Sequence, residues 1–218
     1  CGRAVRSPSS TRVAACSPPP APSADGTRAA NAGPCSRVLA ATAVPTAHRF
    51  TSHPTRLMQI TWLGHSGFRI TLADAVLLID PWLTGNPLFP AERRAEATAG
   101  VTHIFLTHAH SDHLGDAIAI ARDTGAPIAG IYDFVAALEA EHGIATIGFN
   151  KGGTVTAGGA AVTMVNASHS SSHDGKAVGS EAGFMIAAEG HVVYVSGDTD
   201  IMADMDWMGD YHKPDIGI

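Results

Sequence analysis

The chain changes character at Leu57, and this boundary limits the part that can fold around a core. The residues up to Leu57 carry seven arginines, no lysine and one acid, whereas the residues from Met58 onward carry a net charge of −12. Eight of the thirteen prolines and all three cysteines also precede this boundary. Since the first part has almost no large apolar residues, it cannot bury enough surface to offset its ordering entropy. We therefore expect a disordered extension over 1–57 and one folded domain over 58–218.

Two interpretations of this extension stay open. Its content of arginine and serine, with a single acid, is typical of an organelle transit peptide, and the apolar run at 38–44 resembles the core of a secretory signal. The alternative is an upstream extension with no folded role, because the chain opens on Cys1 rather than Met. The part after Leu57 has no cysteine, which suits a reducing compartment, so we expect a cytoplasmic protein.

Short apolar segments separated by turn residues follow Met58, and they predict mainly strands with interspersed helices. The predicted strands are 58–62, 68–72, 76–79, 101–106, 128–131, 154–156, 161–166, 183–188, 191–195 and 215–218. The predicted helices are 91–97, 112–122, 132–141 and 201–208. This order indicates a layered α/β or α+β architecture. No stretch approaches the roughly 20 apolar residues that a membrane-spanning helix needs, so we expect no membrane partner.

Ionisable side chains concentrate in the decapeptide Thr-His-Ala-His-Ser-Asp-His-Leu-Gly-Asp at 107–116, directly after a predicted strand. Residues two apart in an extended segment point the same way, so His108 and His110 can reach one ion. Asp112 and His113 turn into the next helix and could hold a second ion. Imidazole and carboxylate ligands suit Zn²⁺ best, with Mn²⁺ or Fe²⁺ as alternatives. The competing interpretation is a histidine-rich solvated loop.

The pattern His-x-His-x-Asp-His after a strand resembles the signature of the metallo-β-lactamase superfamily. Other segments are similar to its branch of uncharacterised metal-dependent hydrolases, related to L-ascorbate 6-phosphate lactonase. They are Thr-Trp-Leu-Gly-His-Ser at 61–66, Leu-Ile-Asp-Pro-Trp-Leu-Thr-Gly-Asn-Pro at 78–87, Asn-Lys-Gly-Gly-Thr at 150–154, His-Ser-Ser-Ser at 169–172 and Ser-Gly-Asp-Thr at 196–199. The resemblance begins at Met58, and it implies a four-layer αββα sandwich with metal ions at one edge of the sheets.

The same resemblance implies two metal ions and a set of protein ligands. In chain order the implied ligands are His108, His110, Asp112, His113, His169 and Asp198. The first two histidines and His169 would hold the first ion, and the Asp112–His113 pair would hold the second. Asp198 would bridge the two ions, and Asp112 and Asp198 would be the catalytic carboxylates, with Asp112 also taking part in proton transfer.

Several of these residues have a second interpretation. Without the resemblance, His169 is a lone histidine in a polar loop, and Asp198 is the N-cap of the helix predicted near 201. His65 lies between the first two predicted strands, where it is either a residue of a tight turn or a contact to substrate or a ligand. Asp80 matches a position that orients a metal-binding histidine, so we expect it beside the ligands rather than on the metal.

The resemblance also requires one more histidine, well after Asp198, as a ligand of the second ion. The sequence up to Ile218 has none in that context, because His212 directly precedes Lys213 and Pro214, ahead of the last predicted strand. We therefore expect a C-terminally truncated domain with a complete shell for the first ion and an incomplete one for the second.

These expectations lead to a metal-dependent hydrolase, with dinuclear zinc in the full-length protein. Two divalent ions lower the pKa of a shared water from about 15.7 towards 7, so the nucleophile would be metal-bound hydroxide. A small ester, lactone or phosphoester is the expected substrate. The acidic folded part argues against nucleic acid as a partner, since nucleic acids bind basic surfaces. A homo-oligomer stays open, and the alternatives to the enzyme are a metal-binding module and a truncated product without turnover.

Overall fold

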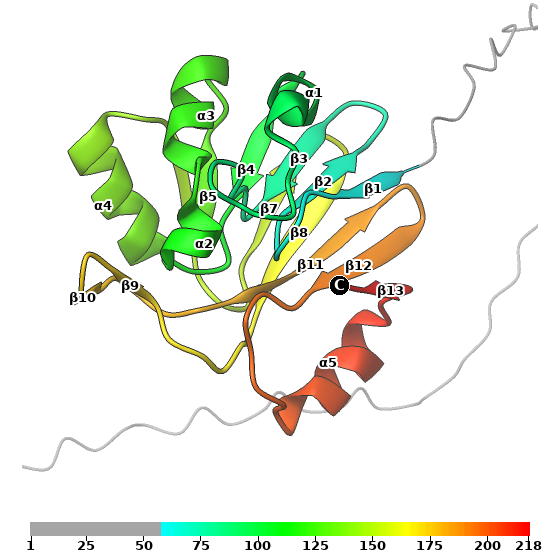
Figure 1. The fold of residues 1–218 in the computed structure, drawn as a ribbon. Coiled ribbons are helices and arrows are strands. Elements are labelled where there is room, and N and C mark those ends of the chain that lie inside the picture. Colours follow the sequence, from blue (N-terminus) through cyan, green and yellow to red (C-terminus); the bar gives the residue numbers. More distant parts are fainter. Residues whose placement is uncertain (1–57) are drawn as a thin grey trace, which may run out of the picture. The chain divides into compact units, whose positions relative to one another are not determined.

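The computed structural model describes residues 58–218. The predicted extension lies outside the described residues and stays a prediction. The described part has two β-sheets face to face, with helices on both outer surfaces (Figure 1). The mixed α/β fold and the αββα layering that the sequence predicts are therefore confirmed.

The first sheet has six strands in the order β1-β2-β3-β4-β5-β6. They are β1 (Gln59–Trp62), β2 (Phe68–Thr71), β3 (Val76–Ile79), β4 (His103–Phe105), β5 (Ile128–Ile131) and β6 (Thr146–Phe149). The first three form an antiparallel meander, and β3 to β6 are parallel neighbours. Every residue of β5 is buried, as expected for a parallel strand covered on both faces.

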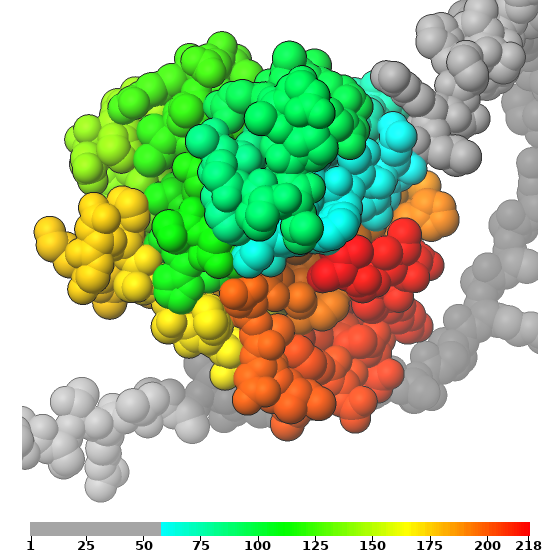
Figure 2. Space-filling view, in the orientation of Figure 1, coloured from blue at the N-terminus to red at the C-terminus, as the bar shows by residue number. Residues whose placement is uncertain are grey.

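The second sheet has five strands in the order β13-β12-β11-β8-β7. They are β7 (Thr154–Ala157), β8 (Ala160–Val165), β11 (Gly183–Ala188), β12 (His191–Val195) and β13 (Ile216–Gly217). A separate hairpin is formed by β9 (Ser172–His173) and β10 (Lys176–Ala177). It projects from the body of the molecule at the left of the space-filling view, where the surface is gold (Figure 2).

The helices cover the outer face of each sheet. They are η1 (Ala91–Arg93), α1 (Arg94–Thr98), α2 (Ser111–Leu114), α3 (Ala117–Thr124), α4 (Tyr132–His142) and α5 (Asp204–His212). On the first sheet, α3 buries Ile120 and α4 buries Leu138 in the main core cluster. On the second sheet, α5 packs Met208 against Val165 and Met185. Among the described residues, no helix is long and apolar enough to cross a membrane.

The helix predicted over 112–122 is wrong as one element, because the chain breaks at Gly115. This glycine has a φ of +38°, and a Cβ there would lie 2.5 Å from the Cα of Trp82. The next residue, Asp116, donates its backbone N–H to the carbonyl of Pro81 at 2.9 Å. The close approach of the loop after β3 therefore divides the segment into α2 and α3.

Other boundaries differ from the sequence prediction in smaller ways. The helix predicted over 201–208 begins at Asp204 and extends to His212, and β4 is shorter than the predicted strand. Strand β6 and the β9–β10 hairpin were not predicted at all. In β6 a glycine, Gly148, stands where a Cβ would lie 2.7 Å from the ring of Tyr132, and glycine weakens a strand signal.

Aromatic residues fill the space between the sheets. The ring of Phe105 in β4 meets the ring of Phe184 in β11 edge-on, with centroids 5.5 Å apart. Phe149 in β6 also stacks with Phe184, with ring centroids 6.2 Å apart. These contacts align the two sheets, and the segments that follow β3, β4, β8 and β12 meet at one edge of the sandwich.

Candidate metal centre

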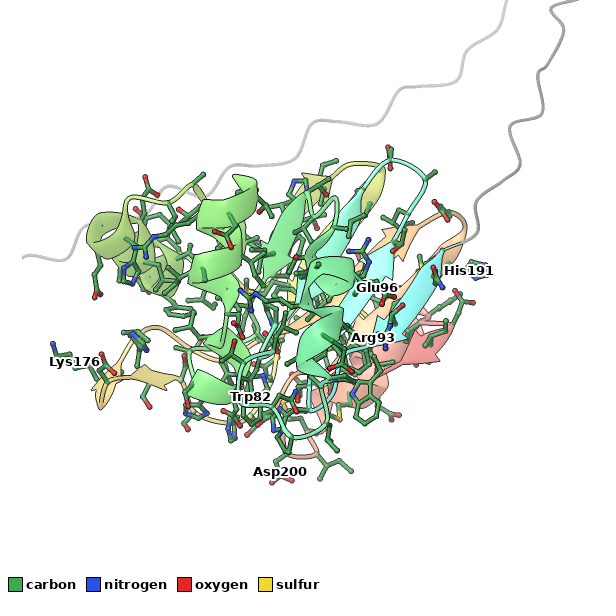
Figure 3. The ribbon with its side chains drawn as sticks, turned by 45° about the horizontal axis from the view of Figure 1, so that its top comes forward. Trp82, Arg93, Glu96, Lys176, His191 and Asp200 are labelled. Carbon is green, nitrogen blue, oxygen red and sulfur yellow. The ribbon has the colours of Figure 1, made fainter. Side chains whose placement is uncertain are left out.

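The candidate site is built from the segments that follow four strands, two from each sheet. The backbone N–H of Ala182, just before β11, donates to the carbonyl of Thr107 at 2.9 Å and joins the two sheet edges. A Cβ on Gly197 would lie 2.8 Å from the Cβ of Thr107, so the segment after β12 packs directly on the histidine motif. In Figure 3, Trp82 and Asp200, which follow Asp80 and Asp198 closely in sequence, both lie at the lower edge of the molecule.

Three imidazoles form the first cluster of the site. Nε2 of His108 lies 3.0 Å from Nδ1 of His110. The ring of His169 is nearly perpendicular to both, with centroids 5.1 Å from each. One ring nitrogen from each histidine lies within 4.8 Å of the other two. The structure therefore brings together the three histidines that the sequence assigns to the first ion.

His113 occupies the centre of the second cluster. Its Nδ1 lies 2.9 Å from Oδ2 of Asp80, and both side chains are buried. Its Nε2 lies 3.4 Å from Oδ2 of Asp198 and, within the described part of the chain, has no hydrogen-bond partner. The same carboxylate oxygen is 3.7 Å from Nε2 of His169. Asp198 therefore stands between the two clusters.

The interpretation of Asp198 as a helix N-cap is wrong, because α5 begins at Asp204 and the residue before it is Ala203. The solvated-loop interpretation of the histidine motif is wrong as well. His108 is 1% exposed and His113 is fully buried, although His110 keeps partial contact with solvent. The facing ring nitrogens of His108 and His110 need a proton or a cation between them.

Asp80 organises the inner side of the site. Its carboxylate accepts hydrogen bonds from the backbone N–H of Thr107 at 2.8 Å and from the Thr107 hydroxyl at 2.6 Å, in addition to His113. The residue has a φ of +44°, a conformation that is uncommon outside glycine. It lies beside His113 and is not a member of the three candidate ligand groups.

The electrostatic surroundings shift the pKa values of the two buried histidines, His108 and His113, in opposite directions. Burial lowers the pKa of His108 to about 4, and the charge of His113 acts in the same direction. Burial also acts to lower the pKa of His113, but the hydrogen bond to Asp80 and the charges of Asp80 and Asp198 outweigh it and raise that pKa. His108 is therefore neutral at pH 7, the form in which an imidazole binds a metal ion.

Asp112 and His65 lie on the outer side of the site. Oδ2 of Asp112 is 3.4 Å from Nε2 of His65, and the two side chains are 41% and 35% exposed. The ring of His65 lies edge-on to the ring of His113, with centroids 5.3 Å apart. His65 therefore lies in the turn between β1 and β2 and beside Asp112 and His113, and its contact to substrate or a ligand stays a prediction.

The donor set fits divalent cations. Ring nitrogens of His108 and His110 face each other, and the buried Nε2 of His113 has no hydrogen-bond partner among the described residues. Three groups of histidine and aspartate have ligand atoms within 4.8 Å of one another: His108, His110 and His169; His108, His113 and Asp198; and His65, Asp112 and His113. The groups share members, as expected where neighbouring ions share a site.

Sequence reasoning did not assign a role to several residues that support this site. The Thr107 hydroxyl lies 3.0 Å from Nδ1 of His108, and the Ser171 hydroxyl accepts the backbone N–H of Ala109 at 3.3 Å. Asp116 accepts the backbone N–H groups of Leu83 and Thr84, each at 2.7 Å. Thr107 and Asp116 flank the histidine motif in the sequence, and this position is the only sequence feature that could have indicated their supporting role.

The remaining histidines stand apart from these groups. His173 forms a long ion pair with its neighbour Asp174 at 3.8 Å and does not join the candidate ligands of the described chain. The ring of His212 lies edge-on to the ring of Tyr211 at the end of α5. Neither supplies the additional ligand that the resemblance requires after Asp198.

The fold and the histidine motif together define a class of protein. Residues 75–217 match the family model described as the beta-lactamase superfamily domain, and the chain belongs to that superfamily. Within it, the chain is a member of the UPF0173 family. A UPF0173 metal-dependent hydrolase of Cereibacter sphaeroides (strain ATCC 17029) is 67% identical over 165 residues, which cover 74% of this chain and 72% of the relative. A UPF0173 metal-dependent hydrolase of Paracoccus denitrificans (strain Pd 1222) is 64% identical over the same shares of both chains.

Solved structures show the same fold. Igni18, described as a novel metallo hydrolase from the hyperthermophilic archaeon Ignicoccus hospitalis, is 30% identical with a TM-score of 0.64, covering 73% of this chain and 69% of that chain. A protein of Veillonella parvula, described as a possible metal-dependent hydrolase, is 20% identical with a TM-score of 0.57 over the same shares. The resemblance to the metallo-β-lactamase superfamily is therefore confirmed. The relation to L-ascorbate 6-phosphate lactonase stays a prediction.

Proposed function

We propose that this protein is a hydrolase that uses two divalent metal ions, with zinc as the natural metal. The observation that carries this proposal is the set of overlapping histidine and aspartate groups that includes His113, whose buried Nε2 has no hydrogen-bond partner in the described chain. Neutral imidazoles and carboxylates are ligands that Zn²⁺ prefers, with Mn²⁺ and Fe²⁺ as alternatives. The names of the UPF0173 relatives as metal-dependent hydrolases support it.

The residues of the first cluster would hold one ion through His108, His110 and His169. Asp112 and His113 would hold the second, and Asp198 would bridge them. When bound, the ions would supply Lewis acidity and lower the pKa of a coordinated water towards about 7. In this arrangement Asp80 keeps Nε2 of His113 directed at the site by holding its Nδ1.

The two carboxylates have different surroundings and therefore different roles. Asp198 lies between His113 and His169, where it fixes the positions of groups from both sheets. Asp112 is 41% exposed, so it can exchange a proton with solvent and is suited to pass a proton to the leaving group. The part of the chain after Leu57 contains no cysteine that could act as a nucleophile.

A small ester, lactone or phosphoester is the proposed substrate class. The net charge of the residues from Met58 onward is −12, which disfavours an extended polyanion. We retain the cytoplasm as the proposed location, on the absence of cysteine from that part of the sequence.

The test combines metal analysis with hydrolysis assays on the chain loaded with Zn²⁺, Mn²⁺ or Fe²⁺. Ester, lactone and phosphoester substrates would be offered in parallel. We expect turnover that a chelator abolishes and metal restores. His110→Ala is expected to remove metal and activity together, whereas His142→Ala, a histidine at the end of α4, changes neither. Metal binding without turnover on any substrate would favour a metal-binding module, and full metal content in His110→Ala would contradict the ligand set.

A further inference from the structure

We propose that His65 is itself a metal ligand, which completes the second cation site together with Asp112 and His113. This inference rests on the proposed metal centre and names a residue that the metal-binding motif does not contain. The second ion would then have three protein side chains, drawn from the β1–β2 turn and from α2.

The geometry places the three side chains around one point. One ligand atom from each of His65, Asp112 and His113 lies within 4.8 Å of the other two. Nε2 of His65 approaches Oδ2 of Asp112 to 3.4 Å, which is longer than a hydrogen bond between such groups. This separation between Nε2 of His65 and Oδ2 of Asp112 leaves space for an ion that both atoms could bind.

The inner member of the group, His113, has a ring nitrogen that can bind a cation at this position. Nε2 of His113 is buried and has no hydrogen-bond partner in residues 58–218, and a carboxylate oxygen of Asp198 lies 3.4 Å from it. Its other nitrogen is held by Asp80. A cation beside His65 and Asp112 would satisfy this atom, which a solvent-facing role for His65 alone would not.

The backbone holds His65 in an unusual conformation. Gly64 and His65 have φ values of +90° and +51°, and the latter is uncommon for a residue with a side chain. The indole N–H of Trp62 donates to the carbonyl of His65 at 2.7 Å, and the ring of Trp82 lies edge-on to the imidazole at 5.2 Å. Strained residues that the surroundings hold in place tend to occur at functional sites.

The chemistry of this group suits an ion that takes part in a reaction. Two imidazoles and one carboxylate are the protein ligands of known catalytic zinc sites, which leave a further position for water or substrate. The side chains of His65 and Asp112 are 35% and 41% exposed, so the outer side of this group is open to solvent.

The experiment measures Co²⁺ binding to the chain by equilibrium dialysis and by the visible absorption of the bound ion. The variant is His65→Asn, because asparagine tolerates positive φ and removes only the imidazole. We expect the wild type to bind two ions. The variant should bind the first with unchanged affinity and the second at least about tenfold more weakly, since even residues that only orient ligands affect metal affinity by that much. His191→Asn, an exposed histidine of β12, is the matched control and should bind like the wild type.

Failure of this proposal is distinguishable from failure of the proposed function. Two ions bound with wild-type affinity by His65→Asn would overturn the role of His65 and leave the hydrolase intact. A wild type that binds one ion would overturn the second site, and a wild type that binds none would overturn both proposals. Should His65→Asn not fold, the wild type would instead be loaded with a spin-active cadmium isotope and measured by NMR spectroscopy. Coupling between the metal and Nε2 of His65 supports the proposal, and its absence from an assigned His65 signal overturns it.

Discussion

Asp80 and His113 form a fully buried pair, in which Nδ1 of the imidazole lies 2.9 Å from the carboxylate and Nε2 faces the site. The pair joins the end of β3 to α2, two elements of the first sheet layer that are distant in sequence. Because Asp80 also accepts two hydrogen bonds from Thr107, one carboxylate positions both His113 and the start of the histidine motif.

Asp80→Asn is expected to weaken metal binding by about 10–100-fold, because the amide no longer holds His113 as a carboxylate does. Asparagine tolerates the positive φ of this residue, so the turn is preserved. Equilibrium dialysis with elemental analysis measures the effect. Asp174→Asn is a matched control, since Asp174 also has a positive φ of 49° but an exposed side chain. Equal affinities in the two variants would contradict the role of Asp80.

Asp116→Asn is expected to destabilise the fold by about 1–3 kcal/mol at pH 7. The carboxylate accepts hydrogen bonds from Leu83 and Thr84 and pairs with Arg94, and the variant weakens these contacts around a buried group. Burial opposes the charged form, but these hydrogen bonds outweigh it and lower the pKa of Asp116.

The difference between Asp116→Asn and the wild type should therefore depend on pH. A lowered pKa in the folded state adds stability above the unfolded-state value of about 3.9, and this stability is lost as pH falls through the folded-state pKa. Urea unfolding between pH 7 and pH 3 should show the two proteins converging at the acid end. A difference that stays constant over this range would show that the charge of Asp116 does not contribute.

Gly115→Ala is expected to be more damaging than Gly125→Ala. Both glycines have positive φ, so each alanine incurs a backbone cost of about 1–2 kcal/mol. Only at Gly115 does the new Cβ overlap the backbone of Trp82, whereas nothing lies within 4 Å at Gly125. We expect about 1–3 kcal/mol of additional loss at Gly115, measured by thermal or urea unfolding. Equal losses would show that α2 can move away from the loop after β3.

Metal removal is expected to lower the melting temperature. A ligand that binds only the folded state adds about 4.1 kcal/mol at a thousand times its Kd, so Zn²⁺ at that excess should give a large shift that a chelator reverses. His110→Ala should reduce the shift, because His110 faces His108 at 3.0 Å in the first cluster. A shift that is the same in this variant would place the bound metal elsewhere.

The local parts of the fold could be predicted from the sequence. The meander β1–β3 follows from short apolar runs with glycine and aspartate turns, and its observed bounds agree within one residue at each end. The break at Gly115 could not be predicted, because it depends on Trp82, which the sequence separates from α2 by many residues. Strand β6 was missed for the same kind of reason, since Gly148 makes room for Tyr132.

The candidate site, like the fold, could be predicted from the sequence only in its local parts. The proximity of His108 and His110 follows from their spacing of two along an extended segment. His169 and Asp198 follow segments of the second sheet, and their approach to the motif could be expected only through the family resemblance. The lack of a hydrogen-bond partner at Nε2 of His113 results from three-dimensional packing, and the residue pattern does not indicate it.

The candidate ligands come from both halves of the domain. His108 and His113 belong to the half of the domain that ends with β6, whereas His169 and Asp198 belong to the half that begins with β7. Neither half alone carries all three proposed ligands of the first ion. Cleavage of the chain in the turn at 150–153 would produce two fragments, each of which would bind zinc weakly on its own. A zinc ion bound by residues of both fragments would hold them together as a cross-link.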